Sequence, residues 1–285
     1  MFKIIIMALL IFIGMVGYDN ITDKAQPTTP IQQEQQKVSK HEKSAAMALF
    51  TSLLPPKEEW PSPVHKFYLA FNMDEVIDPI RQNPNWTSLD AMSRDIPQAL
   101  IAIEDHAFYN HGAIAVEGIL RAALANINAG EVVQGGSTLT QQFVKNVFLS
   151  HEQSMERKIE EAVLSLMLED NYSKDEILEL YLNTTYFGAG STGIKQASRT
   201  YFGKAPSALT LAEAAVIASL PYAPTSLNPL ENPEGCKKRQ LLVLAAMHKY
   251  GMINQGQLQK PRPKKSVSPT APSCKAVTKS TLYIF

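Results

Sequence analysis

The stretch Ile101-Ala-Ile-Glu-Asp-His-Ala-Phe-Tyr-Asn-His111 begins the region that decides the fold of this chain. Two further stretches follow, Gln134-Gly-Gly-Ser-Thr-Leu-Thr-Gln-Gln-Phe-Val-Lys-Asn146 and Met155-Glu-Arg-Lys-Ile-Glu-Glu-Ala162. Together they contain a carboxylate pair, a Gly-Gly-Ser-Thr turn that leads into a polar-striped helix, and a cluster of Arg-Lys and Glu-Glu pairs. Burial alone does not explain this clustering, and we interpret the stretches as three walls of one active-site cleft.

Glu104 follows the apolar run Ala99–Ile103, and Asp95 is a candidate N-cap before it. The pattern predicts a helix that ends at Glu104. Partial desolvation there would raise the carboxyl pKa towards the range useful for a general base. An Asp/Glu pair on an exposed turn is the simpler alternative, and the two downstream stretches favour catalysis. The nearby His106 and His111 have no metal-ligand spacing, so we expect no metal role for them.

The second stretch predicts a helix that starts with a capping box, because Gln141 is three residues after Thr138. One face of this helix is polar and contains Thr138, Gln142, Lys145 and Asn146. A normal surface helix also has a polar face. Amides and hydroxyls with a single cation nevertheless suit a sugar, and the helix N-terminus offers N–H groups and partial positive charge to an anion.

The third stretch predicts a helix over residues 154–169. Its predicted apolar stripe is Met155, Ile159, Ala162, Val163 and Leu166. Arg157 and Glu161 are neighbours one turn apart, roughly opposite this stripe. The simpler alternative is a surface ion pair worth at most about 1 kcal/mol. Because Leu164 and Leu168 extend the side of Arg157 and Glu161, we expect a largely buried helix whose charges face the cleft.

Two glutamates on different elements, Glu104 and Glu161, suit one class of reaction when cations lie near them. The nearby cations are Lys145, Arg157 and Lys158. One carboxylate would deprotonate a sugar hydroxyl, and the cations would stabilise negative charge on a phosphate leaving group. Because 57 residues separate the glutamates, only folding can bring them together.

Five motifs occur in a characteristic order. They are Glu104-Asp-x-x-Phe-x-x-His111, Gly136-Ser-Thr-x-Thr-Gln-Gln-x-x-Lys-Asn146, Arg157-Lys-x-x-Glu161, Ile177-Leu-Glu-x-Tyr-Leu-Asn183 and Leu211-x-Glu-Ala-Ala215. In these motifs the chain resembles the peptidoglycan glycosyltransferase family, which is the transglycosylase domain of penicillin-binding proteins. The resemblance covers roughly residues 85–255. It implies a mostly α, lysozyme-like, two-lobed fold with a small membrane-facing lobe.

The resemblance also implies a role for each matched residue. Glu104 would be the general base on the 4-hydroxyl of the acceptor sugar, and Glu161 would assist at the leaving group. Lys145, Arg157 and Lys158 would bind pyrophosphate or glycan. The remaining implied substrate-binding residues are Asp105, Phe108, His111, Thr138, Gln142 and Asn146.

The implied substrate is lipid II, which such enzymes polymerise into a growing glycan strand with inversion and release of undecaprenyl pyrophosphate. Many family members use a divalent cation, so magnesium or manganese is expected, with unknown ligands here. Two positions depart from the family pattern, because Ala107 replaces a usual arginine and Ala115 a common aspartate. The transpeptidase motifs Ser-x-x-Lys and Lys-Thr-Gly are not found, which indicates a monofunctional enzyme or a truncated gene product.

Composition allows one sizeable core, because 45% of the 285 residues are hydrophobic. Lys+Arg and Asp+Glu each number 27, so net charge argues for no partner, and no nucleic acid is expected. The charge is uneven, since no acidic residue follows Glu234 while many lysines do. This basic end would either contact anionic lipid or form a solvated tail. Cys236 and Cys274 predict neither a disulfide framework nor a metal site.

Residues 1–18 are predicted as a membrane anchor, with a cleaved signal as the alternative. A polar stalk is expected at 19–63, the glycosyltransferase domain at 64–255 and a basic, disordered tail at 256–285. Lys3 on the inner side would place the catalytic domain outside the cell (inner) membrane, where transpeptidases or other cell-wall machinery are the expected partners. Further helices are predicted over 177–182, 209–219 and 237–250.

Two other functions compete with this interpretation. A lytic enzyme that cleaves glycan would also use a buried glutamate, but hydrolysis produces no pyrophosphate for Lys145, Arg157 and Lys158 to bind. An inactive, membrane-anchored scaffold is the second alternative, and the presence of both Glu104 and Glu161 weighs against it.

Overall fold

The computed structural model describes residues 68–69, 72–130, 135–149 and 155–258. It divides the chain into two units, Met1–Pro79 and Ile80–Phe285. The predicted anchor, the predicted stalk and nearly all of the predicted tail lie outside the described residues, so these boundaries stay predictions. Among the helices that are described, none combines the length and the apolar character needed to cross a membrane.

The described part of the first unit leads into helix α4 (Asp74–Arg81), which continues into the second unit. The Tyr68 hydroxyl donates a hydrogen bond to Glu75, and the side-chain amide of Asn72 donates one to the Tyr68 carbonyl at 3.0 Å. The first bond joins the start of α4 to Tyr68, and the second lies within the segment before the helix.

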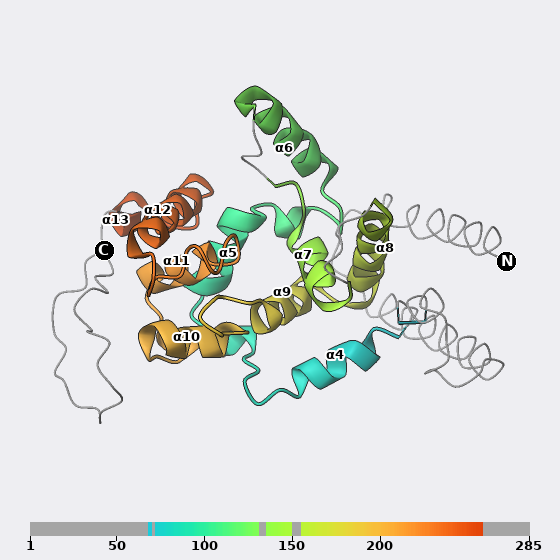
Figure 1. Ribbon diagram of the computed structural model, residues 1–285, viewed down its shortest axis with the longest axis horizontal. Helices are drawn as coiled ribbons and strands as arrows, with labels where there is room; N and C mark the ends of the chain where they lie inside the picture. The colour runs from blue at the N-terminus through green and yellow to red at the C-terminus, as the bar shows by residue number, and fades with distance from the viewer. Residues whose placement is uncertain (1–67, 70–71, 131–134, 150–154, 259–285) are drawn as a thin grey trace. The chain divides into compact units, whose positions relative to one another are not determined.

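Helices also form almost all of the described second unit (Figure 1). In chain order they are η2 (Leu89–Ala91), α5 (Asp95–Glu104), η3 (Phe108–Asn110), α6 (Val116–Ala129), α7 (Leu139–Val147), α8 (Met155–Asn171), α9 (Lys174–Thr184), α10 (Ile194–Phe202), η4 (Pro206–Ala208), α11 (Leu211–Ser219), α12 (Pro233–Lys249) and α13 (Gln255–Leu258). Among the described residues, the β-type pairing is limited to one bridge, Tyr186 to Thr192. The predicted mostly α class is confirmed.

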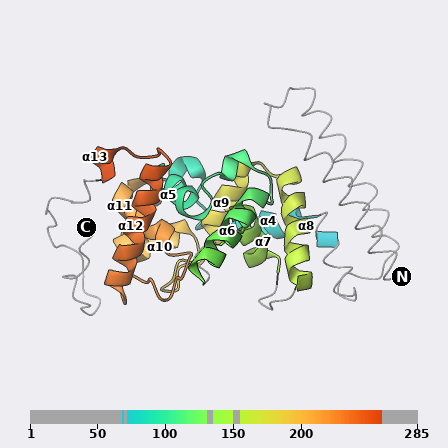
Figure 2. The same cartoon turned by 90° about the horizontal axis from the view of Figure 1, so that it is seen from above.

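The helices of the second unit pack in two groups of three. Helices α5, α11 and α12 contact one another, as do α7, α8 and α9. Helix α10 packs on both α9 and α11, so it connects the groups. Figures 1 and 2 show both groups from perpendicular directions. The candidate catalytic residues come from α5 in one group and from α7 and α8 in the other.

Capping boxes define where three of these helices begin. The side chains of Thr138, Ser173 and Thr210 each accept a hydrogen bond from the backbone N–H three residues later. The Gln or Glu side chain at that later position accepts a hydrogen bond from the backbone N–H of the capping residue. The box predicted at Thr138 is confirmed. The helices predicted over 177–182, 209–219 and 237–250 are also confirmed, with ends at 174–184, 211–219 and 233–249.

The predicted helix before Glu104 is present, but its predicted N-cap was wrong. Asp95 is the first helical residue of α5, and the N-cap position belongs to Arg94, whose side chain makes no capping bond. Helix α5 is held by burial instead, since Ile96, Ala99 and Leu100 have almost no exposed surface. Tertiary packing therefore replaces the missing cap.

The apolar stripe predicted for α8 was wrong. Ile159, placed on the core side by the periodicity, is 56% exposed, while Leu164 and Leu168 are buried. The core-facing side is therefore the side that carries Glu161. The pattern misled because this helix has apolar residues on both sides, so spacing alone could not tell which side faces α7 and α9.

Helix α6 differs from the other described helices because all of its large apolar side chains are exposed. In Figure 1 it projects away from the packed groups, and it makes no extensive contact with another described helix. Gly130 ends it in the left-handed conformation. The exposed apolar side chains are Val116, Ile119, Leu120, Leu124 and Ile127. Such a contiguous apolar surface on a projecting helix is typical of an interaction site.

Candidate active site

Glu104 lies at the C-terminal end of α5, as predicted, and one of its two carboxylate oxygens is already bound. Oε2 accepts a hydrogen bond from Gln142 Nε2 at 3.1 Å. Oε1 is buried and has no hydrogen-bond partner among the described residues. A buried polar atom without a partner is costly, so in a candidate active site it is a candidate for binding a group of the ligand. Glu104 therefore has one anchored oxygen and one available oxygen.

Burial raises the pKa of the Glu104 carboxyl above its ordinary value. The hydrogen bond from Gln142 and the charges of Arg239 and Lys145 act in the opposite direction, while Asp105 adds to the increase. A carboxylate in this environment is a stronger base than an exposed one, yet nearby cations favour its ionised form. This combination is the one that general-base catalysis requires.

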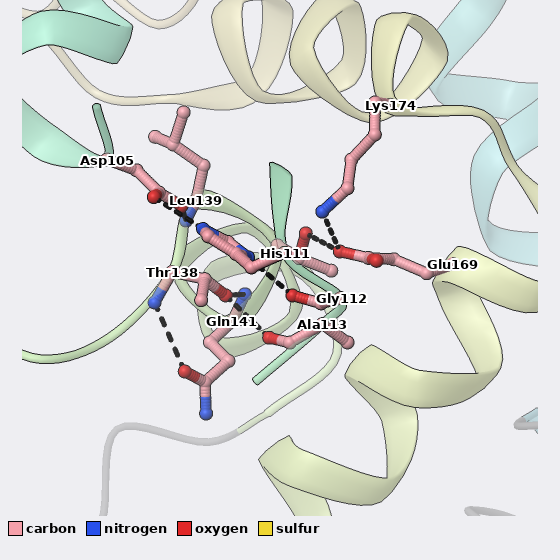
Figure 3. A network of polar contacts seen from close by, with 10 residues as sticks. Asp105, His111, Gly112, Ala113, Thr138, Leu139, Gln141, Glu169 and Lys174 are labelled. Carbon is pink, nitrogen blue, oxygen red and sulfur yellow. Dashed lines mark hydrogen bonds and ion pairs between the residues drawn. The ribbon is translucent and has the colours of Figure 1, made fainter. Parts of the chain in front are cut away.

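Asp105 connects the first motif to the start of α7 (Figure 3). Its Oδ1 lies 2.6 Å from His111 Nε2, and its Oδ2 accepts a hydrogen bond from the backbone N–H of Leu139 at 3.0 Å. His111 Nδ1 is 2.6 Å from the Gly112 carbonyl. Burial by itself lowers the pKa of His111, but the bonds to Asp105 and Gly112 outweigh it and raise this pKa. The polar atoms of Asp105 and His111 thus hold the site together.

The N-terminus of α7 does bind an anion, but that anion belongs to this chain. The Leu139 N–H donates to the Asp105 carboxylate, and the Gln141 N–H donates to the Thr138 hydroxyl. The Thr138 hydroxyl in turn donates to the Ala113 carbonyl at 2.7 Å. The helix N-terminus was predicted to offer its N–H groups to an anion, and the anion it binds in the structure is the Asp105 carboxylate.

Phe108, predicted to line the substrate site, is fully buried. Lys174 Nζ lies 4.5 Å from the centre of its ring, and Lys174 also pairs with Glu169 (Figure 3). The Thr140 hydroxyl donates to the same Glu169 carboxylate at 2.5 Å. These contacts join α7, α8 and α9, so Phe108 supports the site from the core.

On the other side of α7, Glu161 is buried, with 2% of its side chain exposed. Its ion-pair partner is Lys158, three residues earlier in the sequence. The Lys158 side chain is about half exposed, and its Nζ also donates a hydrogen bond to Ser137 Oγ at 3.2 Å. Lys158 therefore links α8 to the turn before α7.

The structure describes no direct contact between Glu104 and Glu161. Each of them is linked by hydrogen bonds to α7 or to the turn before it. Glu104 reaches this helix at Gln142, and Glu161 reaches the preceding turn through Lys158. The predicted polar face of α7 continues with Lys145 and Asn146, both of which are exposed. These last two are thus open to a ligand, whereas Thr138 is buried in the capping box.

Tyr181 and Arg239 are the two site residues that sequence reasoning missed. Tyr181, within the fourth motif, donates a hydrogen bond to Gln142 Oε1 at 3.0 Å. Arg239 on α12 acts on the Glu104 carboxyl, and its Nε is buried without a hydrogen-bond partner in the described part of the chain. Arg239 lies in the helix predicted over 237–250, but no motif in the sequence distinguished it from the other basic residues that follow Glu234.

No group of three or more His, Cys, Asp or Glu side chains is placed to hold a metal ion within the described ranges. The divalent cation implied by the resemblance therefore has no ligand set on these residues. It stays a prediction, and no step below depends on it.

Residues 73–248 match the family model described as transglycosylase. This chain belongs to the transglycosylase family. The match contains Glu104, Gln142, Glu161 and Arg239, so every contact of the candidate site described above lies within the family domain. Family membership, together with the helical architecture, confirms the predicted fold class.

Several relatives share this domain. Penicillin-binding protein 1A of Aquifex aeolicus is 44% identical over 174 residues, which are 61% of this chain and 24% of that protein. A putative transglycosylase of Cupriavidus necator is 41% identical over 183 residues, or 64% of this chain and 79% of that protein. Penicillin-binding protein 2D of Bacillus subtilis is 46% identical over 170 residues, or 60% and 25%. The chain thus matches about a quarter of the penicillin-binding proteins and most of the shorter transglycosylase.

Proposed function

We propose that this transglycosylase-family chain is a peptidoglycan glycosyltransferase that polymerises lipid II, with Glu104 as the general base. The observation that carries the proposal is the Glu104 carboxylate itself. Gln142 binds one oxygen, and the other is buried without a partner among the described residues. An acceptor hydroxyl that donates to Oε1 would satisfy this atom and would begin the proton transfer that the reaction needs.

The reaction moves one proton and exchanges one bond. Glu104 Oε1 takes the proton of the acceptor 4-hydroxyl, and the resulting oxygen attacks the anomeric carbon of the donor sugar. The bond between that carbon and the pyrophosphate oxygen breaks, and its electron pair leaves with undecaprenyl pyrophosphate. Attack opposite the leaving group inverts the anomeric centre. The glycan strand becomes longer by one disaccharide unit, and Glu104 returns its proton to solvent.

Cations around α7 would stabilise the departing pyrophosphate. Lys145 is exposed on α7, and Lys158 lies beside the turn that leads into it. Arg157 is the third cation and precedes Lys158 on α8. Glu161 pairs with Lys158 and would hold its ammonium in place for the leaving group. Stabilisation of the negative charge that develops on a leaving group is often the largest single contribution to catalysis.

The exposed apolar residues of α6 support contact with lipid. A lipid-linked donor requires the site to lie at a membrane surface, and amphipathic helices bind there through their apolar side chains. Leu120 and Leu124 are two such residues on α6. With the predicted anchor at 1–18, this helix would place the site outside the cell membrane, near the transpeptidases that use its product.

The test is an incubation of the full-length chain with lipid II in detergent. We expect glycan polymer and undecaprenyl pyrophosphate, and inhibition by the phosphoglycolipid moenomycin. Glu104→Gln should lower the rate by about 100-fold or more, because a general base contributes about that much. Glu234→Gln is the matched control, since Glu234 is exposed in the first turn of α12.

The same assay distinguishes the rival functions. A lytic enzyme would shorten preformed glycan strands and make no polymer from lipid II. An inactive scaffold would do neither. The cations near Glu161 favour the synthetic reaction, because hydrolysis of a glycan produces no pyrophosphate to stabilise.

A further inference from the structure

Tyr181 is a fully buried residue whose hydroxyl lies two hydrogen bonds away from the proposed reaction. It comes from the middle of α9 and donates to Gln142 Oε1 at 3.0 Å. Gln142 then donates from Nε2 to Glu104 Oε2 at 3.1 Å. The three residues belong to three helices, α9, α7 and α5. Helices α7 and α9 pack directly on each other, which fixes the distance between Tyr181 and Gln142.

A glutamine amide can present either its oxygen or its nitrogen to a neighbour, and the two orientations favour opposite states of Glu104. When the nitrogen faces the carboxylate, the amide donates a hydrogen bond and favours the ionised base. When the oxygen faces it, the amide can only accept, and Glu104 must then carry a proton. Whatever selects the orientation of Gln142 therefore also selects the state of the base.

We propose that Tyr181 is a positioning residue of the glycosyltransferase reaction, because its buried hydroxyl holds the Gln142 amide with the nitrogen towards Glu104. This inference rests on the proposed function. The hydroxyl satisfies Gln142 Oε1, so the amide keeps its nitrogen for Glu104 Oε2 and leaves Oε1 of the base to the acceptor.

The phenol keeps its donor proton in the working range of the enzyme. Burial and then the charge of Glu104 raise the pKa of Tyr181, and the nearby Thr185 hydroxyl acts in the opposite direction. The charged groups that act on Glu104 itself are Arg239 from α12, Lys145 from α7 and its own neighbour Asp105. None of these charges is altered when the Tyr181 hydroxyl is removed.

The variant that tests this role is Tyr181→Phe, which keeps the ring and removes the donor. Gln142 then loses its partner, so the orientation that requires a protonated base becomes more populated. We expect kcat at neutral pH to fall about 3- to 10-fold, the change that one neutral hydrogen bond gives. The acidic limb of the pH profile should move to higher pH, and KM for lipid II should not change.

Two comparisons separate positioning from simple packing. Tyr201→Phe also removes a buried hydroxyl, one that donates to the Phe187 carbonyl at 2.8 Å, and should leave the acidic limb unmoved. Gln142→Leu should move the limb as Tyr181→Phe does, and the double variant should be no worse than Gln142→Leu alone. A structural role would instead give additive losses without a pH shift, and that result would overturn the proposal.

A direct titration keeps this inference separate from the proposed function. Carboxyl ¹³C resonances of glutamate-labelled full-length protein, assigned by comparison with Glu104→Gln, report the protonation of Glu104 without substrate. Tyr181→Phe should raise the midpoint, and Tyr201→Phe should not. If the midpoint rises but wild-type protein makes no polymer, the positioning role stands and the proposed function fails. If polymer forms and the midpoint does not move, the positioning role fails.

Discussion

Gln142 Nε2 lies 3.1 Å from Glu104 Oε2, and this hydrogen bond joins the proposed base on α5 to the helix that carries Lys145. Helix α7 therefore carries the cation and also binds the base through Gln142. A shift of α7 would move Lys145 and weaken the hydrogen bond to Glu104. The consequence is that small changes at the start of α7, far from the reacting atoms, should affect catalysis as strongly as changes at Lys145 itself.

Glu104→Gln should stabilise the fold at neutral pH while it removes activity. Burial raises the pKa of Glu104 in the folded protein, so its contribution to stability is fully present below the ordinary glutamate pKa and is lost as pH rises through the folded value. Glutamine has no such loss. The melting temperature of the variant should exceed that of the wild type at neutral pH, and the difference should shrink in acid. Equal melting temperatures at all pH values would contradict the cost of burying Glu104.

The pH dependence of polymerisation should have an acidic limb set by Glu104. The base is active when ionised, and its pKa is raised by burial, against Gln142 and nearby cations. Activity should therefore fall at a higher pH than an exposed glutamate would give. The measurement is kcat/KM for lipid II against pH. Glu234→Gln serves as the control and should keep the same limb.

The order of the motifs predicted the family, and the helical periodicity predicted most of the fold. Glu104 at the end of α5 and the capping box at Thr138 were predicted because both depend on neighbours in the chain. The buried side of α8 was not, because Leu164 and Leu168 compete with Ile159 and only tertiary contacts decide between them. The partner of Glu161 was missed for the same reason.

Residue types predicted which side chains matter better than they predicted what those side chains contact. Asp105 binds His111 and the start of α7, and Phe108 contacts Lys174, so these residues support the structure around Glu104. Tyr181 was part of a recognised motif, but no role was predicted for it, because its partner Gln142 is 39 residues away in sequence. Such roles require a pairing across helices, which spacing along one helix cannot reveal.

Thr138→Ala should destabilise the protein by about 2 kcal/mol. The loss of an N-cap costs about 1 kcal/mol, and the buried Ala113 carbonyl loses its donor as well. Thr210→Ala is the comparison on α11, because its hydroxyl donates to Glu213 within its own capping box at 3.0 Å and not to another segment, and it should cost about 1 kcal/mol. Urea unfolding measures both. Equal losses would show that the Ala113 bond adds nothing.

Helix α6 should become protected from amide hydrogen exchange when anionic vesicles are added to the full-length chain. Its exposed apolar side chains would enter the interface and hold the helix there. Leu120→Glu with Leu124→Glu should remove the protection in α6. Helix α10, which packs on α9 and α11, serves as the internal reference and should not respond. Unchanged exchange in α6 would argue against a lipid-facing role.

The ion pair between Lys158 and Glu161 should contribute more than an exposed pair. Glu161 is 2% exposed, whereas Lys158 is 48% exposed. If the Lys158 ammonium is removed, water can therefore compensate only part of the charge of the buried Glu161 carboxylate. Lys158→Met should cost about 2 kcal/mol, between the values for surface and fully buried pairs. Arg81→Met breaks an exposed pair with Glu176 and should cost less than about 1 kcal/mol.

Adding Glu161→Gln to Lys158→Met should recover part of the lost stability, because the uncompensated buried charge is then gone. The free energy of unfolding in urea, measured for both single variants and the double variant, gives the coupling. Additive losses would mean that the two side chains do not depend on each other. The double variant should nevertheless stay impaired in polymerisation, because one of the three cations proposed to stabilise the pyrophosphate is missing. Recovered stability without recovered activity is the outcome that separates the structural part of this pair from its catalytic part.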